Sequence, residues 1–99
     1  MKKFNRNNNR VLYSNYQVYF KMLCAQINVL AWSVEEDRKT FIRINAARLI
    51  QLSFQFDGYI ECLFDLGIIS ECDYDRFFDF TKQIIYDSNE ILLYLDSTI

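Results

Sequence analysis

The segment that decides the fold is residues 65–74, which read DLGIISECDY. Gly67 has the position of a C-terminal glycine cap, where a left-handed backbone conformation ends a helix. Ser70 and Asp73 follow with the S-x-x-D spacing that caps the start of a helix. The segment therefore predicts an antiparallel helical hairpin whose two helices are joined by a very short turn.

Apolar residues on both sides of this turn recur every three or four positions, as they do on one face of a helix. We expect one helix from about residue 38 to residue 66 and another from the turn to about residue 95. The first has the face Ile42, Leu49, Leu52, Phe56, Tyr59, Leu63 and Leu66. The second has the face Tyr74, Phe77, Thr81, Ile84, Ser88, Ile91 and Leu95.

Three residues interrupt the helix before the hairpin turn. Asn45 and Arg48 fall in or beside its apolar face, so either they fix the register of a core seam or they lie at its rim with Arg48 reaching water. Gly58 lies inside the helix and costs roughly 1 kcal/mol relative to Ala. It predicts a close approach of a neighbouring helix or a bend.

An earlier helix, from about residue 10 to residue 34, is apolar on two faces. One stripe is Leu12, Tyr16, Tyr19, Leu23, Ile27, Leu30 and Val34, and the other is Val11, Val18, Met22, Ala25, Val29 and Trp32. A thin polar seam of Asn15, Gln26 and Ser33 separates them. Such a helix either lies centrally in its bundle or contacts a second subunit.

The break between the first two helices has no Gly or Pro to mark it. The charged residues 35–40 are the best turn candidate, with Ser33 and Glu36 at capping-box spacing or with Asp37 or Thr40 as the cap. The alternative is one long helix over residues 10–66, which would need an oligomer to bury it. We expect residues 1–9 to form a flexible basic arm and residues 10–99 a single domain.

The composition fits an all-α, antiparallel three-helix up-and-down bundle, similar to a four-helix bundle and oligomeric. The chain has no Pro and two Gly, and 52% of its 99 residues are hydrophobic, which is much apolar surface for one small domain to bury. Its three Cys match no zinc spacing and are expected to be reduced. No apolar run is long enough for export or for a membrane span, so we expect a cytoplasmic protein.

The hairpin motif also resembles a known family. Asp65, Leu66, Gly67, Ile69, Ser70 and Tyr74 match the turn of the four-helix-bundle family that includes accessory variability determinants of diversity-generating retroelements and proteins of 23S rRNA intervening sequences. The likeness covers about residues 36–95. It implies a helical bundle that assembles into rings and binds a reverse transcriptase and nucleic acid. The chain departs from that family in having no Pro and a net charge of −2.

Charge is divided between the two halves of the chain. Residues 1–48 hold nine of the eleven cations and three of the thirteen acids, a balance of +6, and residues 49–99 have a balance of −8. The basic candidates for nucleic-acid contact are Arg6, Arg10, Arg38, Lys39 and Arg43. They would form two patches at opposite ends of the first helix, roughly 35–40 Å apart. Such patches would either bind nucleic acid weakly and in a salt-sensitive manner or only increase the solubility of the protein.

The acidic residues form a second set of candidates: Asp57, Glu61, Asp65, Asp73, Asp75 and Asp79. Stacked carboxylates could hold a divalent cation, but the chain has no His to complete a di-metal site of the bundle type. A solvated acidic face, or a face that meets a basic partner, is the better interpretation. We therefore expect no metal and no cofactor.

These patterns favour a non-enzymatic adaptor that self-associates and binds a larger protein, such as a nucleic-acid-handling enzyme. The chain has no His for proton transfer near neutral pH and no Gly-rich phosphate loop. The expected contact residues are Leu12, Tyr16, Val18, Tyr19, Met22 and Trp32. The alternative is a small phage- or plasmid-encoded inhibitor whose acidic face blocks a host nuclease or other defence enzyme.

Overall fold

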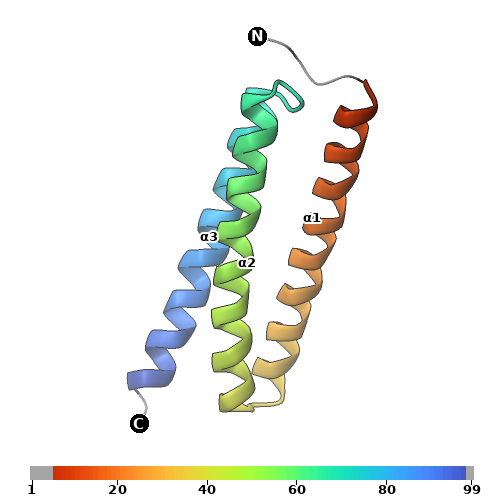
Figure 1. Ribbon diagram of the computed structural model, residues 1–99. Coiled ribbons are helices and arrows are strands. Elements are labelled where there is room, and N and C mark those ends of the chain that lie inside the picture. Colours follow the sequence, from red (N-terminus) through yellow and green to blue (C-terminus); the bar gives the residue numbers. More distant parts are fainter. Residues whose placement is uncertain (1–5, 98–99) are drawn as a thin grey trace.

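The computed structural model describes residues 6–97, with side chains from residue 15 onward. These residues form three helices, α1 (Arg6–Glu35), α2 (Lys39–Asp65) and α3 (Glu71–Ser97), each antiparallel to the one before (Figure 1). The prediction of an all-α three-helix bundle is confirmed. Because α1 begins at Arg6, residues 6–9 of the expected arm belong to a helix, while residues 1–5 lie outside the described part of the chain.

The middle helix, α2, contacts both of the others, whereas no Cα atom of α1 lies within 8 Å of α3 among the described residues. The molecule is accordingly long and thin, at 55 × 19 × 16 Å. Its radius of gyration is 16.0 Å, against about 13 Å for a compact domain of 100 residues. The two apolar faces of α1 therefore do not reflect a central position, because α2 is the central helix.

The turn between α2 and α3 has the predicted geometry. Gly67 has φ 73°, and the N–H of Ile68 donates to the carbonyl of Leu63 at 2.9 Å, as in a Schellman motif. The N–H of Asp73 donates to Oγ of Ser70 at 3.1 Å and caps the start of α3. We call this end of the bundle, at the top of Figure 1, the hairpin end.

The turn between α1 and α2 lies at the opposite end of the bundle, which we call the turn end. It repeats the same motif with an aspartate in place of glycine. Asp37 has φ 52°, and the N–H of Arg38 donates to the carbonyl of Ser33 at 3.2 Å. The break predicted within residues 35–40 is therefore correct, and the single long helix is wrong. The predicted caps are also wrong, because Arg38 occupies the N-cap position of α2 without any side-chain cap.

Aromatic rings close the bundle towards the hairpin end. The ring of Phe56, which is 2% exposed, lies 5.8–6.0 Å from the rings of Tyr16, Phe20 and Phe77. Phe20 also lies 5.8 Å from Phe77 and 6.0 Å from Phe80, so ring contacts connect α1 to α3 where their backbones stay apart. The two edge-to-face pairs among them, Phe20–Phe77 and Phe56–Phe77, add about 0.5–1.5 kcal/mol each to the burial of the rings.

A buried polar network connects α1 to α2 nearer the turn end. Nδ2 of Asn45 donates to Oγ of Ser33 at 2.9 Å, and Nε2 of Gln26 donates to Oδ1 of Asn45 at 3.2 Å. All three side chains are buried, while Arg48 is exposed. The sequence left open whether Asn45 and Arg48 lie in the core seam or at its rim. Asn45 lies in the core seam, and Arg48 lies at its rim.

Two substitutions at the positive-φ positions should act in opposite directions. Gly67→Ala should lower the free energy of unfolding by about 1 kcal/mol, because an L residue is strained at φ 73°. Asp37→Gly should raise it by about 0.5 kcal/mol, because it relieves the same strain. Urea denaturation of both variants measures the difference, and shifts of equal sign would contradict the two assignments.

Two buried serines form a matched test of the polar network. Oγ of Ser33 accepts from Asn45 and donates to the carbonyl of Val29 at 2.9 Å, whereas Oγ of the equally buried Ser53 has no hydrogen-bond partner. Ser33→Ala should cost about 1–3 kcal/mol because it leaves Asn45 unpaired. Ser53→Ala should be neutral or stabilise by up to about 1 kcal/mol. Equal losses in thermal or urea unfolding would count against the network.

Candidate partner-binding site

Helix α1 carries an uncovered apolar row, here called the outer stripe. Its members are three or four residues apart, and all of them are exposed: Val18, Met22, Ala25, Val29 and Trp32. Between 43% and 53% of the surface of the four larger side chains is accessible. The core instead receives the other stripe, including Leu23 and Leu30. A contiguous apolar row of this kind is characteristic of an interaction surface.

A groove of about 540 Å³, here called the outer groove, runs beside the outer stripe between α1 and α2. Its lining consists of Tyr19, Met22, Leu52, Gln55, Phe56, Gly58, Tyr59 and Cys62. A Cβ atom added at Gly58 would have no neighbour within 4 Å. The predicted close helix approach at Gly58 is therefore wrong, and this glycine leaves space in the groove.

The outer groove is suited to an apolar side chain. The rings of Tyr19 and Tyr59 meet edge to face at 5.1 Å across the two helices. Burial raises the pKa of Tyr59, and the neighbouring Tyr19 raises it further, so the Tyr59 phenol stays neutral at physiological pH. No acidic or basic residue lines the groove. It therefore offers apolar contact with a few neutral hydrogen-bonding groups at its edge.

An arginine extends this surface to the turn end. The guanidinium carbon of Arg38 lies 5.5 Å from the ring centres of both Trp32 and Phe41. Phe41 and Ile44 are 43% and 47% exposed. Cation–π contact keeps the Trp32 ring positioned at the surface, and so supports it as a contact residue. We use the name outer face for the outer stripe and the outer groove together with Arg38, Phe41 and Ile44 at the turn end.

The outer face contains most of the contact residues that the sequence predicted. Val18, Met22 and Trp32 belong to the outer stripe, and Tyr19 lines the outer groove. Tyr16 differs, because its ring points inward to Phe56 and Phe77 and serves the core. The side chain of Leu12 lies outside the described residues.

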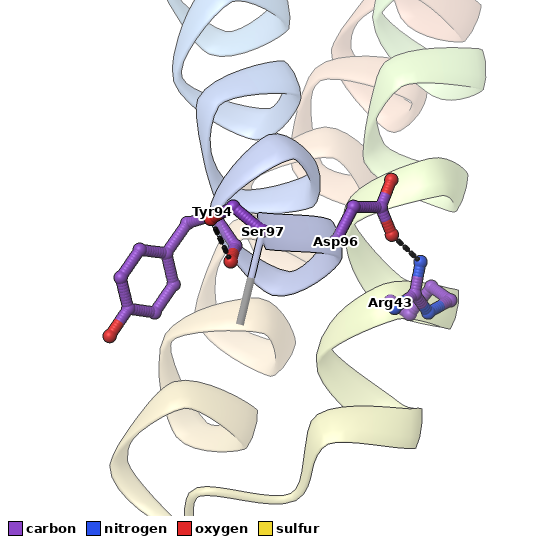
Figure 2. A network of polar contacts seen from close by, with 4 residues as sticks. All are labelled: Arg43, Tyr94, Asp96 and Ser97. Atoms are coloured by element: carbon purple, nitrogen blue, oxygen red, sulfur yellow. Dashed lines mark hydrogen bonds and ion pairs between the residues drawn. The ribbon is translucent and has the colours of Figure 1, made fainter. Parts of the chain in front are cut away.

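The basic candidates are partly engaged within the molecule. Nη1 of Arg43 donates to Oδ1 of Asp96 at 2.6 Å, and this ion pair joins the start of α2 to the end of α3 (Figure 2). In the same view Tyr94 points away from the bundle, and it is 68% exposed. Because Arg43 is paired and Arg38 lies over two rings, the basic surface at the turn end is smaller than the sequence indicated.

The basic residues remain in two groups, as predicted. Arg6 and Arg10 belong to the start of α1 at the hairpin end, with side chains outside the described part, and the remaining three residues lie at the turn end: Arg38, Lys39 and Arg43. Residues 35–37, which read EED, adjoin this second group and offset its charge. Contact of either group with nucleic acid therefore stays a prediction.

The acidic candidates gather at the hairpin end. Burial raises the pKa of Tyr74, and carboxylates from two helices raise it further: Glu61, Asp57, Asp65 and Asp75. These four acids therefore lie near enough to Tyr74 to disfavour ionisation of its phenol. Asp73 lies elsewhere, in a cleft with Phe20 and Phe77, with its Oδ1 atom 4.0 Å from Nη1 of Arg76. Asp79 is exposed one helical turn beyond Asp75.

A second groove, between α2 and α3, was missed by the sequence reasoning. It is lined by Phe54, Asp57, Phe78, Lys82, Gln83, Ile85, Tyr86 and Asn89. Phe54 and Tyr86 are 60% and 61% exposed, and Nζ of Lys82 lies 4.8 Å from the ring centre of Phe78. The available signal was that Phe54 and Tyr86 fall outside the predicted inner faces of their helices.

The fold and these surfaces define a small all-α bundle with two apolar grooves on different helix pairs. No group of three His, Cys, Asp or Glu side chains within the described residues is placed to hold a metal ion. No described helix is long and apolar enough to cross a membrane. Comparison with known proteins gives no matching family model, curated protein or solved structure. The family resemblance of the hairpin motif therefore stays a prediction.

The carboxylate of Asp57 should make stability depend on pH. Burial raises its pKa above the ordinary 3.8, Glu61 raises it further, and the hydrogen bond donated by Thr81 partly opposes both. Because the folded state binds this proton more tightly, Asp57 favours folding at low pH and loses that contribution as the pH rises through its folded pKa.

Asp57→Asn should therefore raise the free energy of unfolding near neutral pH, and the gain should shrink as the pH falls through the raised folded-state pKa of Asp57 and be lost below the ordinary value of 3.8. Urea denaturation across this range measures the effect. Asp79→Asn removes the same charge from an exposed position of α3 and serves as the control. A gain for Asp57→Asn that did not change with pH would contradict the assignment.

Proposed function

We propose that this protein is a non-enzymatic helical adaptor that self-associates and binds a larger protein. The observation that carries the proposal is the presence of two apolar grooves on different helix pairs of a bundle whose core is already filled. The outer groove belongs to α1 and α2, and the second groove to α2 and α3. A bundle with two such surfaces can hold two partners at once.

The two surfaces differ in character, which supports different partners. The outer face is apolar along α1 and carries Arg38 at one end. The second groove mixes the exposed rings of Phe54 and Tyr86 with Lys82 and Asp57. Exposed aromatic groups with a charged rim are typical of contacts between different proteins. We assign self-association to the outer face and the larger protein to the second groove.

Two features bear on the nature of the larger protein, namely the basic groups of α1 and α2 and the resemblance of the hairpin motif. The basic groups at the two ends of α1 suit a partner that carries nucleic acid, because they would add weak phosphate contacts to a protein–protein interface. The family resemblance implies a reverse transcriptase in this role. The adaptor would position the larger protein on nucleic acid, and the larger protein would carry out the chemical reaction.

Partner capture should depend on the second groove. Tagged protein recovered from its native cells at physiological salt should bring down a larger protein together with untagged copies of itself. Phe54→Glu and Tyr86→Glu should each reduce the larger protein at least about tenfold, because a buried unpaired charge opposes binding, and should leave the untagged copies unchanged.

The control is Ala31→Glu, which adds the same charge at an exposed position of α1, outside the two helices that form the second groove. Nuclease treatment should not release the larger protein, because the groove contact does not involve nucleic acid. Unchanged capture by both groove variants, with circular dichroism showing folded protein, would exclude the second groove as the binding site.

A second candidate function has its own observation. Residues 57–79, which form the turn between α2 and α3 and the adjoining parts of both helices, hold seven acids and one cation, and four of the acids raise the pKa of Tyr74. This acidic face could occupy the substrate site of a host nuclease or similar enzyme in the manner of an inhibitor. Charge reversal separates the two candidates. Asp75→Lys with Asp79→Lys should abolish inhibition, whereas Arg38→Glu with Lys39→Glu should impair the adaptor.

A further inference from the structure

The exposed surface of the protein is larger than its mass requires. The accessible area is 7049 Å² for 11.9 kDa, whereas a compact monomer of this mass exposes about 5,900 Å². The difference, about 1,100 Å², follows from the long, thin shape of the molecule, which leaves the outer face uncovered. A standard protein–protein interface takes about 800 Å² from each partner.

The outer stripe has the spacing of a helix that can pair with a copy of itself. Val18 and Trp32 each lie seven residues from Ala25, and Met22 and Val29 lie three and four residues from it. This alternation of three and four is that of a coiled-coil seam. In an antiparallel pair centred on Ala25, Trp32 of one copy lies level with Val18 of the other, and Met22 lies within one residue of the level of Val29.

The side chains along this seam complement one another in size. The smallest residue, Ala25, would meet its own copy, which lets the two helices approach closely. The largest, Trp32, would meet Val18 beside the outer groove, which Tyr19 and Met22 line on the same stretch of α1. Gly58 leaves that groove open. The symmetry of the pair therefore makes two equivalent contacts, each between the exposed indole of one copy and the apolar groove of the other.

Charge favours the same arrangement. Arg38 lies beyond Trp32 at the turn end, and Glu61 and Asp65 are exposed towards the other end of α2. Antiparallel pairing brings Arg38 of one copy to the hairpin end of the second, which holds Glu61 and Asp65 on α2 as well as Arg6 and Arg10 at the start of α1. The two carboxylates of α2 are the groups that attract Arg38. Parallel pairing would instead place Arg38 next to its own copy, and repulsion of like charges would oppose it.

We propose that two copies associate through their outer faces about a two-fold axis beside Ala25, with the α1 helices antiparallel and Trp32 of each copy in the outer groove of the other. This inference rests on the self-association in the proposed function and specifies its geometry. The second groove stays free in the dimer, so that each dimer presents two sites for the larger protein.

The first experiment measures association through Trp32, the only tryptophan of the chain. Its emission should shift to shorter wavelength with rising concentration, in step with dimer formation by sedimentation equilibrium. Ala25→Arg places two cations on the axis, and Gly58→Leu fills the groove. Each should raise the dimer dissociation constant at least about tenfold.

Both substituted positions are open in the single bundle, since Ala25 is exposed and a Cβ at Gly58 meets nothing within 4 Å. The variants should therefore stay folded by circular dichroism. Ala31→Arg makes the same change at an exposed position of α1 outside the outer stripe, and this control should dimerise like the original protein. Dimerisation that survives both Ala25→Arg and Gly58→Leu would overturn the proposal.

The second experiment tests orientation by disulfide formation in a chain whose three cysteines, Cys24, Cys62 and Cys72, are replaced by Ser. A mixture of the Met22→Cys and Val29→Cys variants, distinguished by a tag on one of them, should form mainly mixed disulfides between residues 22 and 29. Mainly 22–22 and 29–29 products would indicate parallel helices. That result would overturn this geometry while leaving self-association intact.

The oligomeric state separates failure of this inference from failure of the proposed function. A protein that stays monomeric at about 1 mM overturns the dimer and the self-association together. The outer groove would then be available to the larger protein. Binding of that protein is tested independently by Phe54→Glu and Tyr86→Glu. The capture experiment with these variants therefore decides the adaptor role, whatever the oligomeric state.

Discussion

The hydrogen bonds among Gln26, Ser33 and Asn45 set the register between α1 and α2, and the arrangement of the surface depends on that register. These groups lie in an otherwise apolar seam. Sliding α1 by one turn would leave buried polar atoms unpaired, at about 1–3 kcal/mol for each. The network thereby fixes which stripe of α1 faces outward and how far Trp32 lies from the outer groove.

Local signals in the sequence were sufficient for the architecture. Gly67 and Ser70 specify the hairpin because a positive-φ cap and a hydroxyl cap act within a few residues. Helical periodicity identified the inner face of α3, whose central positions Thr81, Ile84 and Ser88 are buried. The turn after α1 was located by its charge, since six polar residues cannot continue an apolar face. Its left-handed residue, Asp37, was not identified because aspartate takes that conformation only occasionally and so gives a weaker signal than glycine.

Longer-range features were beyond the sequence. Both stripes of α1 are apolar, and the choice between them depends on Asn45, nineteen residues beyond Gln26. Tyr16 and Tyr19 belong to one predicted stripe, yet one enters the core and the other borders the outer groove, because α2 covers only part of that face. The division of charge along the chain also misleads, since Arg43 neutralises Asp96 across the bundle. Such outcomes follow from packing between helices.

The separation between the backbones of α1 and α3 has a consequence for how the molecule opens. Helix α1 is attached along its length to α2 alone, with aromatic contacts to α3 near the hairpin end. The α2–α3 pair has its own capped turn and its own ion pair. Detachment of α1 is therefore a partial unfolding event, lower in free energy than loss of the whole structure. We therefore expect two cooperative units, the α2–α3 pair and a single helix that is released from it first.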